Sequence, residues 1–390
     1  MNGKAILLGG NSQSLDNIAG QPIAEYVHTK SGTVHKLEGP VNAKNIVFKA
    51  TGDYNDGDTW ILNNTPVAVT YNGGEELLPT AVLIGDVLQA VVMRNQLRLM
   101  LQKPTPQPSI SDNWNLTKPV NQRAKDNYTG GNVYAFDRWV LVYGESGDAN
   151  ISLTSNGVKI NGSGGIRQFF EADLKERICT IAVLDGENKL FTATSPILNI
   201  EGPEWQIGKH FENLWIGFRF REDRERTWDL TITALDKTLK AAKIEFGNRF
   251  TGWPAWDYGA ELLKCQRYQM EFVHPVTNIP TTSERYGVLG TGMATSDTRA
   301  FIFIPTLVQI RTSPVISFKG NIRLRTGPSS NAAVRGPLIT DIVRSPNLSN
   351  NGLCIICQVS KDTPLNVGEM YELWSVPSTE GNSLLADANL

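Results

Sequence analysis

The feature of this sequence that most restricts its fold is a recurring short run of alternating apolar residues between turn residues. From Leu214 to Phe220 every second residue is large and apolar, while Trp215, Gly217 and Arg219 stand between them. A similar alternation follows over residues 228–234. A period of two places successive side chains on opposite faces of a strand. Many such runs, separated by Gly, Pro and Asn, predict an all-β protein.

Length and charge narrow the class further. A chain of 390 residues has room for two or three domains. Its net charge of −2 offers no basic excess for neutralising phosphates, which argues against a general nucleic-acid binder. No apolar run approaches the roughly 20 residues that span a bilayer, so we expect no membrane insertion. The first residues lack a cleavage-site pattern, and four cysteines are few for a disulfide-stapled secreted protein. We therefore expect synthesis in a reducing cytoplasm.

The first half of the chain divides at a proline-rich stretch. Residues 1–49 have weak periodicity and scattered glycines, which predicts an extended arm that attaches to something else. Residues 50–103 contain strand-like runs and a hairpin about Arg94-Asn95, which predicts a small β-module. Alternate prolines within residues 104–110 favour an extended linker, because they block sheet pairing.

The second half predicts two larger β-domains joined by a helix. Residues 111–258 hold many short strand patterns, which predict one β-sandwich. Residues 259–272 predict a connecting helix that Asp257 or Gly259 can open. Residues 273–390 are again rich in strand patterns and predict a C-terminal β tip domain. The expected apolar face of the helix consists of Leu262, Leu263, Gln266 and Met270, with Glu261, Lys264 and Arg267 between them.

Cys354 and Cys357 have the spacing of a redox or zinc pair. A structural zinc site needs four ligands, and no other Cys or His has a matching spacing. A redox pair usually begins a helix, whereas these two cysteines lie in an apolar strand pattern that points them to opposite faces. We predict that they are structural, and that the chain uses no metal or cofactor.

Two carboxylate pairs have the residue types of a glycosidase. They are Glu171 with Asp173 and Asp185 with Glu187, and such residues are also common at turns and strand ends. Nothing in the sequence fixes either pair in a catalytic geometry. The chain also lacks a nucleophile-elbow motif and a phosphate-binding loop motif. We therefore predict no catalytic residue and no enzymatic activity.

Aromatic residues in loops are the better candidates for ligand contact. Trp205, Trp253, Trp256 and Tyr258 stand near Gly or Pro rather than in alternating runs. A rigid aromatic ring can stack on the apolar face of a sugar, and it can equally pack against the protein. We take these four residues as the candidate glycan contacts. Tryptophans in strand patterns are expected in the core, although Trp215 faces away from its apolar neighbours.

Four segments carry a resemblance to a known family. In chain order they are PVNQR at residues 119–123, YTGGNVYAFDRW at 128–139, GIRQFFE at 165–171 and AELLKCQRY at 260–268. They resemble the segments that open, cross and close a sandwich domain found in tailed-bacteriophage fibre proteins. That domain is similar to a carbohydrate-binding module of jelly-roll type. More loosely, residues 50–59 and 85–88 resemble a β-module near the base of head and tail fibres, and residues 385–390 resemble a fibre tip.

The resemblance implies a function as well as a fold. It implies a non-enzymatic virion fibre, made in the host cytoplasm, that is a homotrimer. The N-terminal region would attach to other structural proteins of the virion. The β-domains would project as a receptor-binding unit and adsorb to host cell-surface glycan. The family has no fixed catalytic residues, so none is carried over to this chain.

Two alternatives remain open from the sequence. One is a purely structural head fibre or decoration protein, which would have the same β-domains and no glycan site. The other is a glycan-degrading tailspike. The right-handed β-helix usual in such spikes needs short repeats with stacked positions, and this sequence has no such period.

Overall fold

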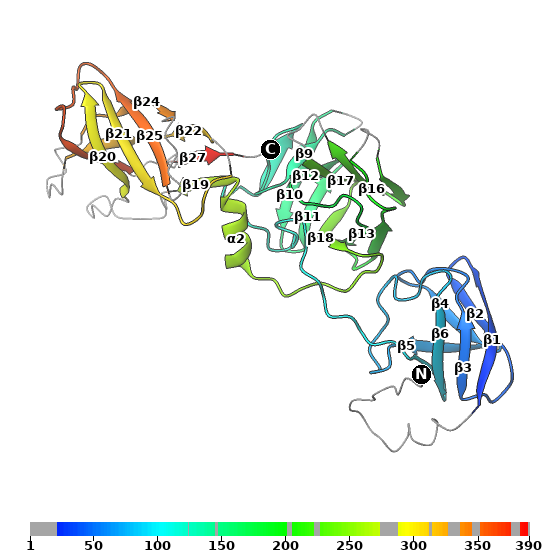
Figure 1. The fold of residues 1–390 in the computed structure, drawn as a ribbon. Helices are drawn as coiled ribbons and strands as arrows, with labels where there is room; N and C mark the ends of the chain where they lie inside the picture. The colour runs from blue at the N-terminus through cyan, green and yellow to red at the C-terminus, as the bar shows by residue number, and fades with distance from the viewer. Residues whose placement is uncertain are drawn as a thin grey trace, which may run out of the picture.

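The computed structural model describes residues 22–123, 125–144, 147–200, 205–221, 227–273, 288–311, 314–326, 336–344, 352–375 and 383–388. This part of the chain is nearly all β, as the alternating runs predict. Its one helix is α2 (Tyr258–Gln266). Three β units follow one another along the chain, and Figure 1 shows them arranged in a row.

The first unit is a closed seven-stranded barrel. Closure pairs every strand on both sides, which leaves no exposed sheet edge. The barrel core includes Leu37, Phe48 and Leu97, each at most 1% exposed. In spatial order the strands are β1 (Ile23–Ser31), β2 (Val34–Glu38), β4 (Thr59–Leu62), β5 (Thr65–Thr70), β7 (Gln96–Leu99), β6 (Val87–Met93) and β3 (Asn45–Lys49).

The predicted arm over residues 1–49 is wrong for its second half. Strands β1, β2 and β3 belong to the barrel, which therefore begins well before residue 50. Tyr26 and Phe48 lie opposite one another in the parallel pair of β1 and β3, and both are buried. These strands alternate buried and exposed positions, but β2 and β3 also pair with β4 and β6, which are more distant in the sequence. Residues 1–21, the remainder of the predicted attachment arm, lie outside the described residues.

The second unit is a two-sheet sandwich. Its sheets enclose a large apolar core that includes Trp139, Phe218 and Trp228. One sheet has the order β14 (Leu190–Thr194), β13 (Cys179–Asp185), β18 (Thr238–Phe246), β11 (Gly157–Asn161), β10 (Ala149–Thr154) and β8 (Asn127–Gly130). The other has the order β15 (Ile207–Phe211), β16 (Leu214–Arg221), β17 (Thr227–Leu235), β12 (Ser163–Phe170) and β9 (Val140–Val142).

Helix α2 is shorter than predicted and buries a different face. Asp257 caps it by accepting a hydrogen bond from the backbone N–H of Ala260 at 3.1 Å, as its N-cap position predicts. The helix ends at Gln266, and Met270 lies in a strand, β19 (Gln269–Val273). The helix buries Glu261 and Cys265, whereas the predicted apolar face had included Leu263, which is 43% exposed.

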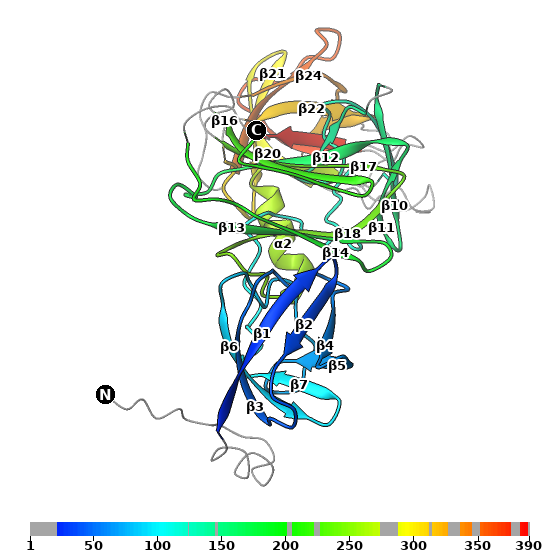
Figure 2. The same ribbon diagram turned by 90° about the vertical axis from the view of Figure 1, so that its right-hand side faces the viewer.

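The third unit contains two sheets around its own apolar core. The smaller sheet has the order β19, β27 (Ser383–Asp387) and β22 (Val315–Lys319). The larger has the order β23 (Ile322–Arg325), β26 (Met370–Ser375), β20 (Val288–Ser296), β21 (Arg299–Pro305), β25 (Gly352–Val359) and β24 (Ile339–Arg344). Because β19 follows α2 directly, the helix leads the chain from the sandwich into this unit, as Figure 1 shows; Figure 2 shows α2 between the barrel and the third unit.

The barrel is held to the sandwich by a few specific contacts. Arg249 donates from Nη2 to both carboxylate oxygens of Asp86 at 2.8 Å, and from Nη1 to the carbonyl of Ala81 at 2.6 Å. The proline-rich stretch has no regular secondary structure, as predicted, but it does not run free of the sandwich. The backbone N–H of Gln107 donates to the Thr251 hydroxyl at 2.8 Å.

Candidate functional site

The outer face of the sheet β15-β16-β17-β12-β9 carries the best candidate site. Strand β16 sends Leu214, Ile216 and Phe218 into the core, where each is at most 3% exposed. The alternation therefore turns Trp215 and Arg219 outward, and both are half-buried. The sequence pattern predicts this division of β16, and the burial confirms it.

Two indole rings meet on this outer face. The Trp205 and Trp215 rings lie 4.8 Å apart between centroids, at an interplanar angle of 84°. Both rings lie against the backbone of Gly217. A Cβ at this glycine would come 2.1 Å from Trp215 and 2.7 Å from Trp205, so any larger residue would displace the pair. The Arg219 guanidinium lies 4.2 Å from the centroid of the Trp205 ring, within range of a cation–π interaction.

A buried carboxylate orients the arginines beside the tryptophans. Asp229 on β17 is 0% exposed although it lies on the outer face. Its two oxygens lie 3.3 Å from Nε of Arg167 and Nε of Arg219, and 3.8 Å from Nη1 of Arg221. The Thr231 hydroxyl donates to Asp229 at 2.7 Å. This fixed carboxylate holds several guanidinium groups in place, which reduces the entropy that a ligand contact would otherwise cost.

The loop that carries Trp205 is fixed at its base. The next residue, Gln206, donates its backbone N–H to the carbonyl of Phe218 at 2.9 Å. Its side-chain oxygen accepts from the backbone N–H of Asn199 at 2.8 Å, and its side-chain nitrogen donates to the Asn199 carbonyl. These contacts of Gln206 hold the neighbouring Trp205 on the sheet.

The other three predicted residues lie together elsewhere, near the start of α2. Trp253 stacks on Trp114 with centroids 5.7 Å apart, and Trp256 meets Trp114 edge-on at 5.3 Å. Trp253 also contacts Phe250 edge-on at 5.3 Å. Trp253 and Trp256 are half-buried, because part of each ring packs against Trp114. Tyr258, predicted in a loop, is the first residue of α2 and is 49% exposed.

The candidate residues therefore form two groups. Trp205 joins Trp215, while Trp253 and Trp256 join Trp114. Sequence reasoning did not select Arg167, Arg219 or Asp229, because nothing local marks them. Their meeting depends on the register of β12 and β16 on either side of β17. The one available signal is the alternation that places Arg219 on the same face as Trp215.

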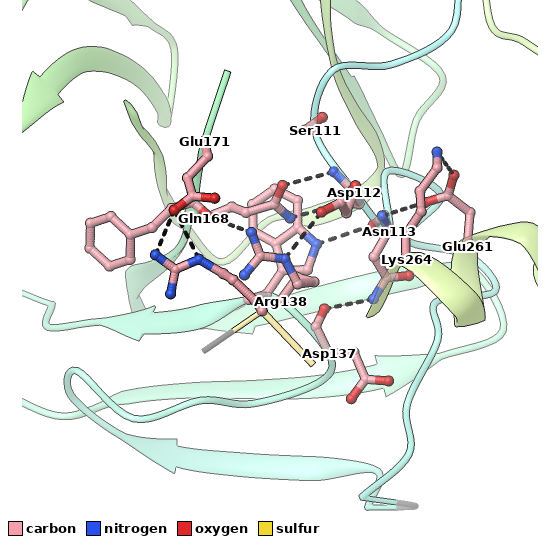
Figure 3. A network of polar contacts seen from close by, with 12 residues as sticks. Ser111, Asp112, Asn113, Asp137, Arg138, Gln168, Glu171, Glu261 and Lys264 are labelled. Atoms are coloured by element: carbon pink, nitrogen blue, oxygen red, sulfur yellow. Dashed lines mark hydrogen bonds and ion pairs between the residues drawn. The ribbon is translucent and has the colours of Figure 1, made fainter. Parts of the chain in front are cut away.

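The segments that carry the family resemblance meet at the junction of sandwich, helix and third unit. In Figure 3, Arg138 points toward Asp112, and its Nε lies 3.2 Å from a carboxylate oxygen. The neighbouring Asn113 donates its backbone N–H to Glu261 on α2 at 2.8 Å. The side chain of Gln168 accepts from the backbone N–H of Asp112 at 2.9 Å and donates to its carbonyl at 2.8 Å.

The same network reaches across to the third unit. Glu171 accepts two hydrogen bonds from Arg311, at 2.9 and 2.6 Å. Asp137 accepts from the side chain of Gln269 on β19 at 3.2 Å. The Arg138 guanidinium lies 3.4 Å from the centroid of the Tyr268 ring. The motif residues thus join three parts of the chain, which gives them a structural role.

The remaining candidates from the sequence have structural surroundings. Asp185 accepts backbone hydrogen bonds from Glu187 and Lys189 and pairs with Lys237 at 2.8 Å. Cys354 and Cys357 are free, buried and part of β25, and burial raises the pKa of the Cys357 thiol. Within the described residues, no three His, Cys, Asp or Glu side chains converge as metal ligands. Over the same residues, no helix has the length and apolar character needed to cross a bilayer.

Comparisons with protein-family models, with curated proteins and with solved structures found no match to this chain.

Proposed function

We propose that this chain is a non-enzymatic fibre protein of a bacteriophage virion whose central sandwich binds host-surface glycan. The Trp205–Trp215 pair on the outer face of the sandwich is the observation that carries the proposal. An indole ring offers a flat apolar surface to the C–H face of a sugar ring. The neighbouring Arg219 offers planar N–H donors of the kind that sugar hydroxyls accept.

The arrangement of the β units supports a projecting protein. The barrel, the sandwich and the third unit succeed one another in a row (Figure 1). In a fibre, the N-terminal region would attach to other virion proteins and the two later units would extend outward. A homotrimer would present three weak glycan sites together, and such multivalency raises the overall affinity without any new contact.

Substituting the two tryptophans tests the glycan site. We expect Trp205→Ala and Trp215→Ala each to weaken adsorption to host cells, or to a responding glycan array, by about tenfold. Loss of one aromatic stack is worth roughly 1 kcal/mol, and trimeric presentation amplifies it. Tyr258→Ala, at the exposed candidate residue that begins α2, is the matched control and should adsorb as the wild type does. Thermal melting verifies that each variant is folded.

Other results of these adsorption experiments would support a different glycan site or one of the two alternative functions. If Tyr258→Ala and Trp256→Ala lose adsorption while Trp205→Ala keeps it, the glycan site lies at the start of α2. If the wild type adsorbs to no cell or glycan, the protein is a structural head fibre or decoration protein. If the wild type shortens a capsular polysaccharide, the tailspike alternative replaces the proposal.

A further inference from the structure

The N-terminal barrel encloses a chain of hydrogen-bonded side chains that has no part in the proposed glycan site. His28 on β1 and His35 on β2 are 2% and 0% exposed. Nδ1 of His28 lies 3.0 Å from both the backbone N and the hydroxyl of Thr51. Nε2 of His28 lies 3.0 Å from Nδ1 of His35, whose Nε2 lies 3.0 Å from Asp58. The chain thus runs from exposed Thr51 to buried Asp58.

A donor at one end, the Thr51 N–H, and an acceptor at the other, the Asp58 carboxylate, fix both imidazole tautomers. The backbone N–H of Thr51 can only donate, so Nδ1 of His28 accepts. Nε2–H of His28 then donates to His35, and Nε2–H of His35 donates to the Asp58 carboxylate. All four ring nitrogens are engaged. The Thr51 hydroxyl could accept from a protonated His28 Nδ1, but the Thr51 backbone N–H would then lose its acceptor.

The charges around the chain oppose an added proton on His28. Lys30 donates to Asp58 at 2.6 Å and to the Asp53 carbonyl at 2.5 Å. Burial, His35 and Lys30 together lower the pKa of His28 to about 4. Burial also lowers the pKa of His35, although Asp58 and Asp53 act to raise it.

The remaining neighbours add no charge near neutral pH. Phe48 and Trp60, from β3 and β4, pack on His28, and Tyr54 lies 6.0 Å from His35. Burial raises the pKa of Tyr54 to about 12. In the folded protein the pKa of His28 lies below its ordinary value of 6.5. The hydrogen bonds that link Thr51, through the two histidines, to Asp58 are therefore favoured above pH 6.5. That contribution is lost as the pH falls toward 4.

The loop that this chain holds also forms part of the barrel's contact with the sandwich. Within residues 50–58, Asp56 accepts from the backbone N–H of Leu190 in the sandwich at 2.9 Å. Tyr54 exchanges backbone hydrogen bonds with Thr80 and Val82 at 2.8 Å. Residues 80–86, in turn, hold Arg249 of the sandwich. We call residues 50–58 and 80–86 the docking loops.

We propose that the Thr51–His28–His35–Asp58 chain is an acid-sensitive latch. Protonation of His28 removes the acceptor of the Thr51 N–H and frees residues 50–58. The docking loops then loosen together, and the barrel loses its fixed orientation on the sandwich. Mild acid would therefore change how the proximal unit of the molecule is joined to the rest, while the sandwich and third unit keep their folds.

Hydrogen–deuterium exchange of the full chain, read by mass spectrometry and corrected for intrinsic rates, tests the latch. Between pH 7 and pH 5 we expect opening of the docking loops to increase by about tenfold or more, because the open state binds the extra proton. Peptides of β16 and β17 should change little. The variant Arg249→Ala, measured at pH 7, gives the exchange pattern of an undocked barrel.

His28→Asn supplies the decisive comparison. Its side-chain oxygen can accept from the Thr51 N–H and has no proton to gain, so its docking loops should keep their protection at pH 5. His210→Asn, at an exposed histidine of β15, should respond to pH as the wild type does. Equal loosening in His28→Asn and wild type would overturn the proposal. If His28→Asn does not fold, the wild type decides: uniform exchange across all units, or no change in the docking loops, also overturns it.

Discussion

Gly217 shows how one small residue can create the candidate site. Its missing side chain leaves room on the sheet for two indole rings, which any Cβ would displace. Asp229 acts in the opposite way, because it fills the face with a buried charge that several arginines must cover. The candidate site therefore combines the space that Gly217 leaves for the two indole rings with the fixed buried charge of Asp229.

A buried ion pair at Lys243 gives a prediction about stability. Lys243 is fully buried and donates to Glu245 at 2.9 Å and to the Gly252 carbonyl at 2.7 Å. Glu245 in turn accepts from the backbone N–H of Thr251 at 2.8 Å. We expect Lys243→Met to lower the free energy of unfolding by about 3–5 kcal/mol, because it leaves a buried carboxylate without its cation. Urea denaturation of the sandwich measures this.

The double variant Lys243→Met with Glu245→Gln is the control for that experiment. Gln keeps an oxygen that the Thr251 N–H can reach and removes the unpaired charge. It should therefore recover part of the lost stability. A single variant that costs less than about 1 kcal/mol would show that the pair is not desolvated as its burial indicates.

Among the elements, α2 departs most from its sequence pattern. A helix of this length is not stable alone and must dock on other parts of the protein. It docks through Glu261 rather than through its leucines, since the Glu261 carboxylate accepts from the backbone N–H of Asn113. An amphipathic pattern places charged residues on the solvent side of a helix. The predicted buried face of α2, which excludes Glu261, is therefore wrong.

Glu261 can be tested against its apolar replacement. Glu261→Leu would improve the apolar pattern of the helix, but it leaves a buried backbone N–H at Asn113 without an acceptor. We expect it to destabilise the junction by about 1–3 kcal/mol. Glu261→Gln keeps an acceptor and should cost less. If the leucine variant melts at the same temperature as the glutamine variant, the hydrogen bond to Asn113 does not stabilise the docked helix.

In the whole molecule, two junctions set the positions of the three units relative to one another. The barrel meets the sandwich through Arg249 and the docking loops. The sandwich meets the third unit through contacts of Asp137 with Gln269 and of Glu171 with Arg311, next to α2. Both junctions are rich in charged and polar contacts. Their geometry can therefore respond to pH and salt while the apolar cores remain intact.

The oligomeric state of the whole molecule is also a testable prediction. The proposed fibre is a homotrimer, so sedimentation velocity at micromolar concentration should give a mass of three chains. Trp205→Ala should leave that mass unchanged, because the proposed glycan site is separate from assembly. A stable monomer under these conditions would count against the fibre proposal.

The sequence alone predicts the fold class, the faces of strand β16 and the strand position of Cys354 and Cys357, and it limits the N-cap of α2 to Asp257 or Gly259. These features follow from local periodicity and local hydrogen bonds, which a few neighbouring residues specify. It also placed Trp205 among the candidates for ligand contact, because a loop aromatic is visible without any partner.

Which of these residues meet depends on the tertiary structure. Strands β2 and β3 join the barrel through pairings with the more distant strands β4 and β6. Trp205 meets Trp215 because β15 pairs with β16, and Asp229 meets Arg167 because β17 pairs with β12. The contact of His28 with Thr51 likewise depends on the pairing of β1 with β3. Strand register is set by packing across the whole sheet rather than by either strand alone, so these meetings could not be read from the local pattern.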